Sequence, residues 1–183
     1  QGDGYVLPYC DSPANRDAVS NHLYMELLGQ ATQYAWFFTP YLMLGDTLLD
    51  AFVRAAQRGV DVRIFVPGVP DKKLAYRMTQ SFFRPLLEAG VRIYTYTPGF
   101  LHAKACLLDD EIGMLGTVNL DYRSLFLHFE CNALFYRASL LRDLKQDFEE
   151  TLPSCKEITQ QDLRKALCSR MLDCVLRIIS PLC

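Results

Sequence analysis

Residues 101–130, LHAKACLLDDEIGMLGTVNLDYRSLFLHFE, are the most informative segment for the fold of this chain. An apolar run is followed by the polar triplet Asp109, Asp110 and Glu111, and a second apolar run comes after it. This pattern predicts a β-hairpin with strands over residues 102–108 and 112–116. Because residues i and i+2 of a strand face the same side, His102 and Lys104 are expected to point together.

The returning strand is expected to bring two further polar residues, Thr117 and Asn119, close to His102 and Lys104. An imidazole, an ammonium group, a hydroxyl and a carboxamide together suit a phosphodiester. Lys104 supplies positive charge, Thr117 and Asn119 donate hydrogen bonds to non-bridging oxygens, and His102 attacks phosphorus or moves a proton. No acidic cluster or pair of histidines is spaced to hold a metal, so no metal and no other cofactor is expected.

Around the hairpin, strand-like and helix-like segments alternate, which is typical of a sheet covered by helices. We therefore expect an α/β fold with a mixed, mostly parallel sheet flanked by helices on both faces. The expected strands outside the hairpin are residues 5–9, 34–39, 60–66, 91–97 and 131–136, and the expected helices are residues 16–32, 46–57, 72–88, 140–150 and 159–179.

The last expected helix has a narrow charged face and a wide apolar one. Arg170, Asp173 and Arg177 follow the i, i+3, i+7 spacing that places them on one side, and most of the remaining residues are apolar. Such an apolar arc must be covered. Two alternatives stay open: the arc packs on this domain or on a missing half, or it binds at a membrane interface.

Composition fits one soluble globular domain and excludes a disordered or coiled-coil protein: the chain has 183 residues, of which 50% are hydrophobic and 22% charged. With 19 Lys and Arg against 21 Asp and Glu, the net charge of −2 argues against a nucleic-acid partner. The seven cysteines are an odd number without a CxxC pair, so we expect reduced, mostly buried thiols rather than a disulfide framework or a zinc site. The chain opens with Gln1 rather than Met, so we expect it to be part of a longer protein.

The hairpin region resembles the HKD motif of the phospholipase D superfamily, HxKx4Dx6G[ST]xN, at every spacing. The flanking stretches DSP (11–13), AAQRGVDVRI (55–64) and LLEAGVRIYTYTPGF (86–100) resemble the C-terminal half of bacterial cardiolipin synthases, and the resemblance covers nearly the whole chain. One position departs, because those enzymes more often carry Asn where this chain has His128. The motif positions are His102, Lys104, Asp109, Gly116, Thr117 and Asn119.

The resemblance implies a phospholipase D-like fold and a phosphatidyltransferase. A phosphatidyl group would pass through a phosphohistidine from one phosphatidylglycerol to a second, releasing glycerol without a metal. The preferred role of His102 is that of the general acid/base, and the alternative is that of the nucleophile. Glu130 matches the acidic residue that orients the active-site histidine. The implied catalytic residues are His102, Lys104, Asn119 and Glu130; the implied phosphate-binding residues are Lys104, Thr117 and Asn119; and Asp109 and Gly116 are expected to be structural.

Superfamily sites contain two such motifs, so the resemblance also implies a partner. We expect an N-terminal HKD half in the parent protein or a homodimer mate, and an isolated monomer that is inactive. On this view residues 1–152 are a catalytic half-domain with the motif at 102–119, and residues 153–183 are a C-terminal amphipathic helix packed on that domain or on a missing partner. The parent would lie at the bacterial cytoplasmic membrane with this domain on the cytoplasmic side, and the fragment itself would be soluble.

Two other functions stay open at this stage. One is a phosphodiesterase or nuclease with a single HKD motif that works as a homodimer, and the other is a non-catalytic lipid-binding module. Outside the motif, Tyr41 is a candidate to line a lipid site and the pair Lys72 and Lys73 to bind a headgroup phosphate. Core packing for the tyrosine and a solvated helix start for the lysines are the more common roles of such residues.

Overall fold

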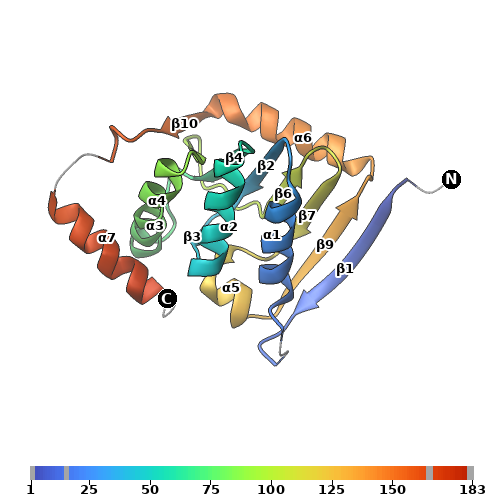
Figure 1. The fold of residues 1–183 in the computed structure, drawn as a ribbon, viewed down its shortest axis with the longest axis horizontal. Helices are drawn as coiled ribbons and strands as arrows, with labels where there is room; N and C mark the ends of the chain where they lie inside the picture. Colours follow the sequence, from blue (N-terminus) through green and yellow to red (C-terminus); the bar gives the residue numbers. More distant parts are fainter. Residues whose placement is uncertain (1–2, 15–16, 164–166, 181–183) are drawn as a thin grey trace.

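The computed structural model describes residues 3–14, 17–163 and 167–180. An eight-stranded sheet in the order β1-β9-β7-β6-β2-β4-β5-β10 forms the centre, with helices on both faces (Figure 1). The strands of this sheet are β1 (Tyr5–Asp11), β2 (Tyr34–Phe38), β4 (Asp61–Pro67), β5 (Arg92–Tyr96), β6 (Ala105–Leu108), β7 (Ile112–Gly116), β9 (Glu130–Tyr136) and β10 (Cys155–Ile158), and β3 (Leu42–Met43) pairs separately with β8 (Leu120–Asp121).

The α/β class and the mixed sheet are confirmed, but the expectation of a mostly parallel sheet is wrong. Only β2–β4 and β4–β5 pair in parallel within the large sheet. The strands β6, β7 and β9 pair antiparallel with one another in that order, and β6 also pairs antiparallel with β2. At the two edges, β1 pairs antiparallel with β9 and β10 with β5. A short turn can join only antiparallel neighbours, so the hairpin itself imposes this half of the topology.

The aromatic strand β2 shows how the sheet divides the core. Tyr34, Trp36 and Phe38 lie in one apolar cluster, and Phe37 lies in the other. This is the period of two that a strand imposes, and both faces of β2 are buried. The helix on the Trp36 side is α6, and the larger cluster collects residues from the other long helices.

The helices largely follow their expected ranges, with one break. The expected helix over residues 72–88 is two helices separated at Phe82. An uninterrupted helix would set the ring of Pro85 against the carbonyl of Ser81 and would lack one N–H donor, so the chain breaks in that turn. The helices are α1 (Val19–Gln30), α2 (Asp46–Gln57), α3 (Lys73–Ser81), α4 (Phe83–Glu88), α5 (Tyr122–Phe126), α6 (Leu140–Thr151) and α7 (Leu167–Ile179), with a 3-10 turn, η1, at Leu152–Ser154.

The first helix starts later than expected because a distant carboxylate caps it. Asp11, at the end of β1, accepts hydrogen bonds from the N–H groups of Val19 and Ser20, both at 2.9 Å. These N–H groups have no partner inside the helix. Of the expected helix over residues 16–32, residue 16 lies outside the described part.

The C-terminal segment departs most from expectation. Residues 155–158 form β10 on the sheet edge, and the expected helix over 159–179 is described only from Leu167. Asp162 accepts hydrogen bonds from the N–H and hydroxyl of Thr159, at 2.9 and 2.7 Å, and these bonds hold a turn where the helix was expected to begin. Residues 164–166 lie outside the described part.

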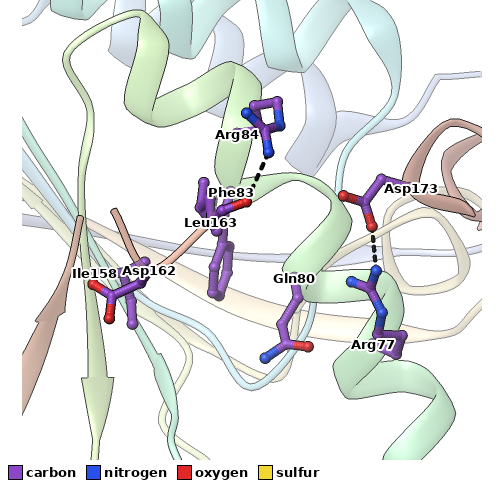
Figure 2. A pocket seen from close by; sticks show the side chains of 8 residues that line it. All are labelled: Arg77, Gln80, Phe83, Arg84, Ile158, Asp162, Leu163 and Asp173. Carbon is purple, nitrogen blue, oxygen red and sulfur yellow. Dashed lines mark hydrogen bonds and ion pairs between the residues drawn. The ribbon is translucent and has the colours of Figure 1, made fainter. Parts of the chain in front are cut away.

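Helix α7 packs on α3 with its charged face and part of its apolar arc turned inward. Asp173 pairs with Arg77 of α3 beside a cavity of about 310 Å³ (Figure 2). Leu176 is buried, whereas Met171 and Ile178 remain 78% and 77% exposed. Part of the apolar arc is therefore uncovered. Within the described residues, no helix has the length and apolarity needed to cross a membrane.

Candidate active site

The motif is carried by the β6–β7 hairpin, and Asp109 holds its turn. Its carboxylate accepts hydrogen bonds from the N–H groups of Thr32, Gln33 and Tyr34 and from the Thr32 hydroxyl, at 2.7 to 2.9 Å. Partial burial raises the pKa of Asp109, but these hydrogen bonds outweigh it and hold the pKa below its ordinary value. Asp109 also adopts a positive φ of 52°, which Asp tolerates better than most residues. These are the contacts of a structural residue.

Gly116 ends β7 at the opposite end of the hairpin. Its N–H donates to the Lys104 carbonyl at 3.2 Å, which extends the hairpin ladder by one residue beyond β6. A Cβ atom at this position would overlap the side chain of Asn132 and the carbonyl of Cys131 on β9. The motif glycine therefore lets β7 and β9 approach closely beside the polar residues that follow.

His102 and Lys104 precede β6 rather than lying in it, so the strand expected over 102–108 is shorter. The His102 ring is exposed and stacks on Phe100 with 5.5 Å between ring centroids. The half-buried Lys104 donates from Nζ to the His102 carbonyl at 2.8 Å. Partial burial lowers the pKa of Lys104, and the carboxylates of Glu130 and Asp121 oppose this shift. Lys104 is thus a cation within electrostatic reach of two acids.

Thr117 and Glu130 are joined directly. The Thr117 hydroxyl donates to Glu130 Oε2 and accepts a hydrogen bond from the N–H of Cys131 at 2.9 Å. The other carboxylate oxygen lies 3.7 Å from Nδ1 of His128. Across the described residues, no hydrogen bond or ion pair joins Glu130 to His102. Glu130 contacts His128 instead.

Asn119 carries an unusual polar atom. Its Nδ2 donates to Ser124 Oγ at 2.9 Å, while its Oδ1 is buried without a protein partner in the described chain. A buried acceptor without a donor costs about 1–3 kcal/mol. A ligand that donates to this oxygen would recover that cost.

Two residues beside Asn119 were missed in the sequence. Asp121 accepts from the N–H of Ser124 at 2.9 Å and so caps α5, and Ser124 in turn accepts the hydrogen bond from Asn119. Burial raises the pKa of Asp121 despite these hydrogen bonds. An Asp followed by a short helical run is an N-cap signal that could have identified the first of them.

A cavity of about 370 Å³ adjoins Asn119. It gathers three residues that sequence reasoning considered separately, namely Tyr41, Lys72 and His128, whereas His102 and Lys104 do not line it. Apolar and charged groups share its wall. The remaining lining residues are Met43, Leu74, Ala75, Met78, Asp121, Arg123 and Ser124.

In chemical terms, the motif end of the hairpin offers an exposed imidazole, a cation and amide and hydroxyl donors beside a half-apolar cavity. Such groups bind and protonate a phosphodiester. Among the residues that the structure describes, no group of three or more His, Cys, Asp or Glu side chains is arranged to hold a metal ion.

Comparison with known proteins identifies the family. The family model described as "Cardiolipin synthase, PLD-like domain" matches residues 24–152. Cardiolipin synthase 2 of Bacillus cereus is 38% identical over 100% of this chain and 36% of its own length. An uncharacterized protein of Streptococcus mutans is 44% identical over 98% of this chain and 39% of its own. The chain thus spans well under half the length of these relatives.

Solved structures agree on the fold. Nuc of Salmonella typhimurium, a phospholipase D family member, superposes with a TM-score of 0.72 at 15% identity, covering 85% of this chain and 98% of Nuc. Phosphatidylserine synthase of Haemophilus influenzae superposes with a TM-score of 0.73 at 19% identity, covering 97% of this chain and 47% of the synthase. Together with the motif and the mixed sheet, these matches show that the chain belongs to the cardiolipin synthase family of phospholipase D-like domains.

Proposed function

We propose that this chain is the C-terminal catalytic half of a phosphatidyltransferase of the cardiolipin synthase type. The reaction moves the phosphatidyl group of one phosphatidylglycerol to a hydroxyl of a second and releases glycerol. The observation that carries this proposal is the set of polar groups at one end of the β6–β7 hairpin: an exposed imidazole, the cation of Lys104 and the buried Oδ1 of Asn119, which has no partner among the described residues and can accept a hydrogen bond from a headgroup hydroxyl. The family membership supports the choice of a phospholipid as the phosphodiester.

In the proposed mechanism His102 is the general acid and base. It gives a proton to the glycerol oxygen as the bond from phosphorus to that oxygen breaks, and it later takes a proton from the attacking hydroxyl of the second lipid. A histidine of the partner half forms the covalent phosphohistidine between these steps. Lys104 offsets the negative charge that grows on the non-bridging oxygens. Asn119 donates to the same phosphate through the Nδ2 hydrogen that does not bond Ser124, and Thr117 does so when its hydroxyl turns away from Glu130. Glu130 matches the acidic residue that orients the active-site histidine in the family, although here it bonds Thr117 and lies beside His128.

The partner half supplies the second motif, either from the same parent protein or from a second copy of this chain. Both kinds of chain occur among the solved structures. This chain covers 98% of Nuc, which is about one such unit long, but only 47% of phosphatidylserine synthase, which is about two units long. The parent protein would act at the cytoplasmic face of the bacterial membrane.

Exposed apolar side chains near the motif support a lipid surface as the place of reaction. Phe129 is 79% exposed and adjoins His128, and Leu74 is 60% exposed on the wall of the cavity beside Asn119. Phe100, which stacks on His102, and Leu127 are also exposed. Apolar groups around a headgroup site lower the free energy of contact with the acyl region of a bilayer. The uncovered face of α7 adds Met171 and Ile178 to the apolar surface of the molecule.

The experiment uses the parent protein with both halves and vesicles of phosphatidylglycerol labelled in the glycerol headgroup. Transfer predicts equal amounts of cardiolipin and free glycerol, whereas the 183-residue chain as a monomer should release neither. Glycerol release with phosphatidic acid and no cardiolipin would show a hydrolase and contradict the transferase. Cleavage of DNA by the purified chain as a dimer would instead support a nuclease with a single motif.

A further inference from the structure

Two exposed cysteines face each other across the outermost strand pair of the sheet. Cys10 on β1 and Cys131 on β9 are direct register partners. The expectation of mostly buried thiols is wrong for the described residues, because Cys106 is the only buried one of the five cysteines whose side chains are described. β1 is an edge strand, and nothing described pairs with its outer side.

The backbone hydrogen bonds define the kind of pair that these cysteines form. The carbonyl of Cys131 accepts from the N–H of Thr117 at 2.9 Å, and its N–H donates to the Thr117 hydroxyl at 2.9 Å. Both backbone groups of Cys131 therefore point away from β1. Cys10 and Cys131 form a non-hydrogen-bonded antiparallel pair, in which Cα atoms lie about 4.5 Å apart. That separation is within the range of about 4.4–6.8 Å found in disulfides.

The two thiols also interact with each other. A hydrogen bond with the Cys131 thiol is the main cause that raises the pKa of Cys10. The thiols are thus neighbours and both are open to solvent, so a small oxidant can reach them. The raised pKa of Cys10 lowers its thiolate fraction, so the reaction needs alkaline pH.

We propose that Cys10 and Cys131 form a redox-active dithiol that small-molecule disulfides oxidise to a cross-strand disulfide. One cysteine gives its proton to solvent, and its thiolate attacks a sulfur of the external disulfide. The external S–S bond breaks and one thiol leaves, so a mixed disulfide remains on the protein. The second cysteine then attacks the mixed disulfide in the same way and releases the second thiol. Two electrons pass from the pair to the external disulfide, which leaves as two thiols.

The position of the pair connects the edge of the sheet to the candidate active site. Cys131 follows Glu130 directly in β9, and its backbone groups hold Thr117 of the motif. A bond from Cys131 to Cys10 would tie the outermost strand to the strand that carries Glu130. This proposal does not depend on the reaction proposed above.

The test treats the folded 183-residue chain with oxidised glutathione at about pH 8.5, where more thiolate is present. Free thiols are then alkylated, and the protein is digested and analysed by mass spectrometry. We expect the loss of two free thiols, a mass decrease of about 2 Da and a peptide pair that joins Cys10 to Cys131. Cys174→Ser, which removes an exposed cysteine outside the pair, should give the same cross-link.

Cys10→Ser should abolish the cross-link and leave Cys131 as a mixed disulfide with glutathione. If the unmodified chain instead carries separate glutathione adducts on Cys10 and Cys131, or if both thiols stay free, the proposal is wrong. Phenylarsine oxide gives a second measurement on the reduced protein, because its arsenic takes up two neighbouring thiols and releases one water. We expect one bound equivalent that blocks both cysteines and is lost in Cys10→Ser; a Cys10→Ser variant that keeps this equivalent would contradict the proposal.

Discussion

The two ends of the β6–β7 hairpin carry the same motif but treat their polar groups in opposite ways. At the turn, Asp109 accepts four hydrogen bonds and Asp110 is bound by side chains of the sheet and of α6. At the open end, His102 contacts a neighbouring ring and Lys104 bonds a carbonyl of its own segment, while one oxygen of Asn119 is buried without a partner among the described residues. The turn is satisfied by the protein, and the open end is left for a ligand.

This difference shows that residues of one motif can have separate roles, some in stability and others in the chemistry. A carboxylate whose hydrogen bonds are all internal can contribute to stability and has no free capacity for a substrate. An exposed imidazole contributes little to stability and is free to move a proton. Substitutions at the turn should therefore change the free energy of unfolding, and substitutions at the open end should change turnover.

The largest expected effect is on turnover, from His102→Ala. General acid and base catalysis by a positioned group contributes about 10²–10⁴-fold, so the turnover of phosphatidylglycerol by the parent protein with both halves should fall by at least that factor. The free energy of unfolding should change by less than about 0.5 kcal/mol, because the ring is exposed. Cardiolipin formation and urea unfolding measure the two quantities.

His22→Ala is the matched control for this substitution. His22 is also exposed but lies in α1, away from the motif, so both turnover and stability should be unchanged. Near-normal turnover in His102→Ala would remove this histidine from the mechanism.

The second prediction concerns Asp109 at the turn. Asp109→Ala removes four hydrogen bonds and places Ala at a positive φ, so the free energy of unfolding should fall by about 3 kcal/mol. Turnover per folded molecule should stay within about twofold, which corresponds to about 0.4 kcal/mol. Asp109→Asn keeps one oxygen and tolerates the backbone, so it should lose less. A fall in turnover without a loss of stability would assign Asp109 to the chemistry.

The stability contributed by Asp109 should also depend on pH. Its pKa in the folded chain is below the unfolded value of about 3.9, because the hydrogen bonds favour the charged form. The contribution is therefore fully present above about pH 4 and is lost as the pH falls through the folded pKa. The difference in unfolding free energy between the unmodified chain and Asp109→Ala should shrink in acid, and a difference that grows there would contradict this assignment.

The sequence was most informative where local signals and pairing agree. The hairpin, its turn and the helix Asp46–Gln57 follow from apolar runs and polar breaks that short-range rules can interpret. The strand Cys155–Ile158 was missed because it is an edge strand whose only strand partner is β5, 59 to 65 residues earlier. Such a strand depends on tertiary pairing rather than on its own periodicity.

The candidate site was predicted residue by residue but not contact by contact. Spacing identified His102, Lys104, Thr117 and Asn119, because the motif fixes residue types along the chain. It did not reveal that Glu130 contacts His128, since that depends on the path of the short segment that joins α5 to β9. The sequence likewise did not predict which residues of α7 face inward. Asp173 does so because it pairs with Arg77 of α3, and such a partner from another element is not visible in the helix itself.

The third prediction tests the close approach of β7 and β9. In Gly116→Ala the added methyl group overlaps atoms of Cys131 and Asn132, so the strands must separate beside Thr117. We expect a loss of about 1–3 kcal/mol in unfolding free energy, together with reduced turnover. Gly99→Ala is the control, because a methyl group there meets nothing within 4 Å. Equal stability of the two variants would show that the motif glycine is not required for packing.

The smallest expected effect comes from Tyr34→Phe, which weakens the turn without touching Asp109. The Tyr34 hydroxyl donates to the Asp110 carboxylate at 2.7 Å and accepts from the Asp110 N–H at 3.0 Å. Lys145 still pairs with Asp110 at 2.8 Å, and the ring still packs on Trp36, so only the hydroxyl contribution of about 1 kcal/mol should be lost. Urea unfolding at neutral pH measures it, and turnover should not change. A loss larger than that of Asp109→Ala would mean that Asp110 and Tyr34, rather than Asp109, hold the closed end of the hairpin.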